Sequence, residues 1–301
     1  MFRQLIFLYL SVLVLFSCQS RQGRQPGAEF EVPDSVLMTE TLTISSEALE
    51  EIVQNVSSPI EMAALIKELG IPFSTKYLST TDYVDKYNTS FKMAYSLGVF
   101  GADLGYLNIY DKSTQIVDYL TAINKLADGL KVGQFFDFNT LKRLATSREN
   151  IDSLMFISVN SFNNMDSYLR ENNRGHLSAL MIAGTWIEGM YLVTQVAEEK
   201  RSNELNERIG EQKINLNNIM LILNNYKDHE AIADMIKTLS ELKNEFDNIE
   251  ITYKMGEPET VEQDGMIMIV QKEESVVNIT DNQLKNIIRK TEQIRNQLIS
   301  I

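Results

Sequence analysis

Apolar residues recur every three or four positions through most of this 301-residue chain, from about Ser45 onward. This spacing places them on one face of an α-helix, whereas a half-buried strand would need strict alternation. Helix ends are marked as well: the segment from Ser58 to Gly70 opens with an S-x-x-E capping box closed by Glu61 and ends at a glycine. We therefore expect an all-α fold, a multi-helix bundle or right-handed helical array of about nine or ten helices.

The remaining boundaries follow from the same pattern of caps and periodicity. A short amphipathic stripe comes first, formed by Leu49, Ile52, Val53 and Val56. After the capped helix that ends at Gly70, helices are predicted over residues 82–110, 113–131, 139–146, 150–171, 177–200 and 203–226, then one capped by Asp228 and a last one after Thr280, which forms a T-x-x-Q box with Gln283.

Helical spacing fails between Ile251 and Ile279. The segments "ITYK" and "MIMIV" are rich in residues that favour strands, and they predict one small β-hairpin near residues 251–271. Between them, Glu257 to Asp264 is predicted to be an acidic loop.

The N-terminus has the features of an export signal: Arg3 precedes a predominantly apolar stretch that is twelve residues long, from Leu5 to Phe16. This stretch is too short to span a bilayer as a helix. It ends in "LFSC", which resembles the lipobox of bacterial lipoproteins, and Cys18 is the only cysteine in the chain. We predict that residues 1–17 are a lipoprotein signal peptide and that Cys18 carries the lipid; the alternative is an ordinary signal peptide with an incidental cysteine.

The segment from residue 18 to 35 is polar, contains two glycines and two prolines, and predicts a flexible tether, followed by a single helical domain over residues 36–301. Gln19 is not the aspartate associated with retention in the inner membrane, and no acidic run follows the cysteine as in surface-exported lipoproteins of Bacteroidota. The predicted location is the outer membrane, through the lipid anchor, facing the periplasm.

The formal charge of the chain is −13. Nucleic acid is therefore not an expected partner, because its phosphates would be repelled by a surface without basic clusters. A cationic partner, or simple solubility, fits this composition better. The partners that we expect are a basic protein or a small-molecule ligand.

The stretch "LGVFGADLGYLNIY", residues 97–110, places three glycines in an apolar helix, although each weakens a helix by about 1 kcal/mol relative to alanine. On a helical wheel one arc collects the small residues Ala94, Gly98, Gly101, Ala102 and Gly105. Such a stripe lets another helix approach closely, or it leaves room for a ligand against bare backbone. A membrane-spanning interpretation is rejected, because the segment carries too many polar residues.

The apolar stretches of two predicted helices, residues 93–110 and 177–197, each contain a single acidic residue near tyrosines, Asp103 in the first and Glu188 in the second. A buried carboxylate has to accept hydrogen bonds, meet a basic residue or take up a proton. Each acid either fixes how helices dock or belongs to a ligand pocket with Tyr106, Trp186 and Tyr191.

Signatures of common catalytic and cofactor sites are missing from the sequence. The two histidines, His176 and His229, have no second histidine at metal-ligand spacing and are read as polar residues at helix ends, and no phosphate-binding glycine loop occurs. No catalytic residue, metal or cofactor is therefore predicted, although a two-carboxylate glycosidase remains compatible with the sequence.

Residues 58–145 include "SPIEMAALIKELGIPFS", "GVFGADLGYLNIYDK" and "LADGLKVGQFFDFNTLKRLA", and the stretch "GTWIEGMYLVTQVAEEK" lies further on. Together they resemble uncharacterised Bacteroidota-type lipoproteins with an all-helical mature domain. The resemblance implies an envelope location and a helical fold, and it carries over no activity. The sequence predicts a lipid-anchored binding or scaffold protein; the alternative is an envelope enzyme, for example a carbohydrate-active one, that uses Asp103 and Glu188.

Overall fold

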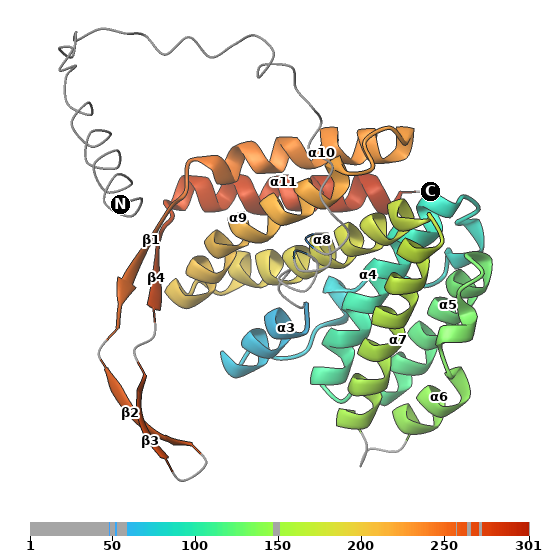
Figure 1. Cartoon of the computed structure of the whole chain (residues 1–301), viewed down its shortest axis with the longest axis horizontal. Helices are drawn as coiled ribbons and strands as arrows, with labels where there is room; N and C mark the ends of the chain where they lie inside the picture. Colours follow the sequence, from blue (N-terminus) through green and yellow to red (C-terminus); the bar gives the residue numbers. More distant parts are fainter. Residues whose placement is uncertain are drawn as a thin grey trace, which may run out of the picture. The chain divides into compact units, whose positions relative to one another are not determined.

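Two apolar helices, α4 (Ser90–Ile109) and α8 (Gly175–Glu199), lie against each other at the centre of the described body (Figure 1). Glycines explain how closely they approach. A Cβ atom on Gly98 would lie 2.0 Å from the backbone oxygen of Met181, and one on Gly184 would lie 2.3 Å from that of Tyr95. The predicted role of the small-residue stripe in helix packing is thus confirmed at Gly98, where the backbone of α8 fills the space.

The next glycine of the stripe has a different neighbour. A Cβ atom on Gly101 would lie 2.9 Å from the ring of Phe162, which belongs to α7 (Ile151–Glu171). The stripe therefore contacts two elements: the backbone of α8 at Gly98 and a side chain of α7 at Gly101.

The computed structural model describes residues 48, 52, 59–146, 151–256, 258–263, 266–270 and 273–300, all within the unit Ile44–Ile301. Ala48 and Ile52 are helical, whereas the rest of the stripe predicted around them, the signal peptide, Cys18 and the tether lie outside the described residues. Nine α-helices are present in these ranges, which confirms the all-α fold class. Besides α4, α7 and α8 they are α3 (Pro59–Glu68), α5 (Ser113–Gly129), α6 (Phe138–Thr146), α9 (Asn203–Asn224), α10 (Glu230–Asp247) and α11 (Asp281–Ile299).

These helices group around the central pair. Helix α5 packs on α4, α6 follows it, and α7 contacts both central helices, as α3 does (Figure 1). Helices α9 and α11 contact α8, and α10 packs on α9 and α11. Within the described part of the chain α8 is the one helix long and apolar enough to cross a membrane, and 89% of its most apolar window is buried against the rest of the body. It is the core helix of this arrangement.

Most predicted helix ends agree with the structure, and two do not. The capping box of Thr280 and Gln283 is present, and Gly70 follows α3 with a φ of +68°, a conformation that favours glycine. Helix α4 begins at Ser90 and not at residue 82, because the Thr89 side chain accepts a hydrogen bond from the Lys92 amide and caps the helix there. Asp228 does not cap α10, whose N-cap residue is His229.

Four strands form a β-ribbon between α10 and α11. Strand β1 (Glu250–Met255) pairs antiparallel with β4 (Glu273–Asn278), and β2 (Glu259–Gln263) pairs antiparallel with β3 (Met266–Val270). The predicted small hairpin near residues 251–271 is confirmed, and both predicted strand segments exist. The two segments do not pair with each other, however: the first pairs with β4 and the second with β2, which occupies much of the predicted acidic loop. In the sequence, Asp264 and Gly265 separate β2 from β3, and Asp-Gly is one of the dipeptides that favour a short connection between paired strands.

Candidate functional site

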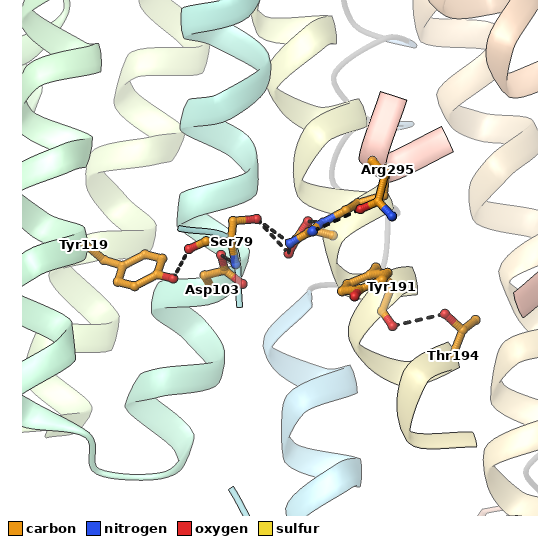
Figure 2. Close-up of polar contacts among 8 residues, drawn as sticks. Ser79, Asp103, Tyr119, Tyr191, Thr194 and Arg295 are labelled. Atoms are coloured by element: carbon orange, nitrogen blue, oxygen red, sulfur yellow. Dashed lines mark hydrogen bonds and ion pairs between the residues drawn. The ribbon is translucent and has the colours of Figure 1, made fainter. Parts of the chain in front are cut away.

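The two acidic residues of the central helices, Asp103 of α4 and Glu188 of α8, lie in one buried polar cluster. Both are 0% exposed. Two residues from elsewhere complete the cluster: Ser79 from the segment before α4, and Arg295 from α11 (Figure 2). We call these four residues the core network.

Arg295 forms a bidentate ion pair with Glu188. Its Nε atom donates to Oε2 over 2.9 Å, and its Nη2 atom donates to Oε1 over 2.7 Å. The guanidinium carbon also lies 4.3 Å from the centre of the Tyr191 ring. Burial alone would lower the pKa of Arg295, but the charge and hydrogen bonds of Glu188 outweigh burial and raise it. Arg295 therefore stays charged inside the protein.

Ser79 connects the network through three of its groups (Figure 2). Its amide donates to Asp103 Oδ2 over 3.0 Å, its hydroxyl donates to Glu188 Oε1 over 3.1 Å, and its carbonyl accepts from the Tyr119 hydroxyl of α5. Ser79 lies between two short 3₁₀ turns, Thr75–Tyr77 and Val84–Lys86. The network thus fixes an irregular segment to α4, α5, α8 and α11.

The pKa of Asp103 is raised well above its usual range. Burial is the largest cause, followed by the negative charge of Glu188; Arg295 and the Ser79 amide act in the opposite direction, and a hydrogen bond with the Glu188 carboxylate raises the pKa further. The Oδ1 atom of Asp103 is buried and meets no donor among the described residues. A proton on Asp103 resolves both problems, since it removes the charge and donates to Glu188.

With Asp103 neutral, Glu188 and Arg295 balance each other. An isolated charge buried at this depth would be strongly unfavourable, whereas a bidentate pair with further hydrogen bonds offsets much of the desolvation cost. The arrangement is therefore suited to holding four elements together without a net charge in the core.

The proton on Asp103 predicts how stability depends on pH. Unfolded Asp103 titrates near its ordinary pKa of 3.8, whereas the folded residue keeps its proton to higher pH. Between these two pKa values the folded state binds one more proton than the unfolded state. The contribution of Asp103 to the free energy of unfolding is therefore complete below pH 3.8 and is lost as pH rises, by up to about 1.4 kcal/mol per pH unit. Asparagine has no such proton, so D103N is expected to gain stability relative to the wild type as pH rises.

Urea denaturation of both proteins at several pH values between 4 and 8 measures this difference. Other titrating groups are common to the two proteins and cancel. A difference that stays constant across the range would mean that folded Asp103 is ionised like the unfolded residue.

The other predicted pocket residues are placed differently. Tyr191 contacts the network through Arg295, as described, but Tyr106 accepts a hydrogen bond from the Ser74 amide over 3.1 Å and stacks on Phe73. Trp186 donates its Nε1 proton to Gln212 Oε1 of α9 over 3.0 Å. Tyr106 and Trp186 therefore each make a contact between elements.

Sequence reasoning missed Arg295 and Ser79. Arg295 had a detectable signal, because it follows Thr291 by four positions on the buried face of α11, where an apolar residue is expected. Ser79 had none, since the irregular segment that carries it shows no periodicity. Its role depends entirely on the tertiary fold.

A surface hollow of about 370 Å³ adjoins the network. Its lining includes Ser79 and Tyr87 at the inner side, Tyr83 and Lys86, and the end of α11. Neither Asp103 nor Glu188 lines it. The hollow therefore reaches the outer member of the network and not the two carboxyl groups.

The two histidines, far apart in the sequence, are neighbours in space. The ring of His176, at the start of α8, stacks on that of His229, the N-cap residue of α10, with centroids 4.1 Å apart. Their expected positions at helix ends are confirmed. Burial, and then the charge of His229, lower the pKa of His176. Among the described residues no group of three or more histidine, cysteine, aspartate or glutamate side chains is arranged to hold a metal ion.

Known proteins give no further guidance to this site: no family model, curated protein or solved structure matches the chain.

Proposed function

We propose that this chain is a lipid-anchored binding or scaffold protein of the cell envelope, held in the outer membrane through Cys18 and facing the periplasm. Its helical body works by binding and not by catalysis. The observation that carries this proposal is the state of its two central acids, which are sealed from solvent, Glu188 held by Arg295 and Asp103 by the Ser79 amide. Side chains used in this way stabilise a fold on which binding surfaces are displayed.

The competing proposal is an envelope enzyme, for example one that acts on carbohydrate with Asp103 and Glu188. Such an enzyme needs both carboxyl groups to reach a substrate. In the described structure Arg295 binds both carboxylate oxygens of Glu188, the Ser79 amide binds Asp103 Oδ2, and the adjoining hollow stops at Ser79. The geometry therefore favours the binding protein.

Two classes of partner suit this proposal. A small polar ligand would fit the hollow beside Ser79, whose volume lies at the lower end of the range for ligand pockets. A basic protein would suit the acidic surface of a chain with a net charge of −13. We give more weight to the basic protein, because the acidic residues are abundant and the hollow contains only one charged side chain, Lys86.

Cys18 provides the direct test of the anchor. In a Gram-negative host fed radiolabelled palmitate, the wild-type protein is expected to incorporate label and to sediment with the outer membrane. C18A has no thiol for the thioether bond, so it should lose at least nine-tenths of the label and stay out of that fraction. Label that persists in C18A would contradict the anchor, whereas a serine replaced in the tether, S20A, serves as the matched control.

A further inference from the structure

We infer that the β-ribbon of residues 250–278 is a docking arm that accepts a basic, extended segment of a partner protein as an added strand. The inference rests on the proposed binding function and names the class of its partner. The arm is distinct from the core network and the hollow, because none of its residues belongs to either.

The root of the arm is held firmly by α9. Val277 is buried, and a Cβ atom on Gly210 would lie 2.3 Å from its Cγ1 atom, so glycine is needed there for β4 to pack on the helix. Ser275 hydrogen-bonds to the carboxylate of Glu211, and Lys213 donates to the carbonyl of Ile249 over 2.7 Å, just before β1. The body therefore presents the arm from a fixed position.

Beyond the root, the arm exposes apolar side chains. Ile251, Tyr253 and Met255 alternate along β1 and share one face of the ribbon. Ile251 lies at the root opposite the buried Val277, whereas Tyr253 and Met255 are 58% and 59% exposed. The face that packs against the body thus continues outward without a covering element among the described residues.

The strands of the arm have edges that pair with no other strand among the described residues. In the described residues β1 pairs only with β4, and β2 only with β3. Each strand therefore has one edge without a strand partner, and such an edge is a template for another strand. A two-stranded ribbon by itself is marginally stable in water, so an added strand would also stabilise the arm.

Charge indicates which strand it would accept. Residues 250–278 contain seven acidic and two basic residues, which gives a net charge of −5. Strand β3, in contrast, is entirely apolar, with the sequence Met-Ile-Met-Ile-Val. Two copies of so acidic an arm repel each other, which protects an apolar edge against self-association. The preferred partner is a segment in which lysine or arginine alternates with apolar residues. Its basic side chains would neutralise the acidic charge of the arm, and its apolar side chains would contact the face formed by Tyr253 and Met255.

Binding of short peptides to the full-length acylated protein in detergent tests the inference. The probe is a fluorescent nine-residue peptide of alternating lysine and valine, measured by anisotropy at low and high salt. Three control peptides replace lysine by glutamate, replace valine by serine, or place one proline at the centre. We expect each control to bind at least tenfold more weakly. The glutamate peptide loses the charge match, the serine peptide loses the apolar contact, and the proline peptide loses a backbone hydrogen-bond donor.

Variants of the chain locate the binding. Replacing residues 256–272 by Asn-Gly closes β1 directly onto β4 and shortens the arm; this variant and Y253S/M255S should each bind the lysine-valine peptide at least tenfold more weakly, with melting temperatures close to the wild type. F156S and L221S remove exposed apolar side chains on α7 and α9 and serve as controls, which should bind normally.

Three results would overturn the inference. They are equal binding of the lysine and glutamate peptides, undiminished binding by the shortened variant, and arm-dependent dimers in sedimentation experiments, which would make a second copy the occupant. None of these results affects acylation of Cys18, so failure of the docking arm is distinguishable from failure of the anchored binding protein.

Discussion

The E188Q variant is expected to lose about 3–5 kcal/mol of unfolding free energy, the loss typical of a buried ion pair from which one partner is removed. Glutamine keeps the size of the side chain but not its charge, so Arg295 remains in the core as an uncompensated cation. The variant also weakens the acceptor for the Ser79 hydroxyl, which holds the segment before α4. Equilibrium denaturation in urea at pH 7 measures the loss.

Two comparisons make this result specific to the buried pair. Glu241 forms an exposed ion pair with Lys290 at 2.9 Å, so E241Q removes the same charge between two helices and should change stability little. The double variant E188L/R295M replaces both charges by apolar groups and should recover most of the loss. If E188Q were as stable as the wild type, the pair would have no structural role, and the enzyme proposal for Glu188 would regain its support.

The fold class could be predicted from the sequence because its signals are local. Apolar spacing depends only on neighbours a few positions away, and caps such as Thr280 with Gln283 act within one turn. The same local periodicity also explains why the predicted start of α4 is wrong. Residues 82–89 contain apolar positions that continue the helical spacing, but the Thr89 side chain caps the helix, so that it begins at Ser90.

The candidate site depends on contacts between distant residues, so only half of it could be predicted. Asp103 and Glu188 were detectable because an acid in an apolar helix is unusual and needs a partner. The sequence does not reveal which residue is that partner, because Ser79, Glu188 and Arg295 come together only when α4, α8 and α11 pack. The pairing of the strands in the ribbon could not be predicted for the same reason, since each apolar segment has more than one possible partner strand.

The contact between α4 and α8 yields the second prediction with a large effect: G98A is expected to cost about 3 kcal/mol of unfolding free energy. The added methyl would lie 2.0 Å from the Met181 oxygen and 2.8 Å from the Thr185 nitrogen, both backbone atoms of α8. Backbone atoms within a helix do not move aside singly, so the two central helices must separate and lose packing along their contact. This loss exceeds the gain of about 1 kcal/mol from better helix propensity.

G101A provides the matched control, because it lies one turn further on the same helix and brings the same gain in propensity. Its methyl would meet the ring of Phe162 at 2.9 Å, and a half-buried side chain is able to turn away at small cost. Its stability should therefore stay within about 1 kcal/mol of the wild type. Thermal and urea denaturation of both variants separate the two effects: equal losses would mean that the glycines serve local helix geometry, whereas a loss confined to G98A identifies the close approach of α4 and α8 as the reason that this apolar helix contains glycine.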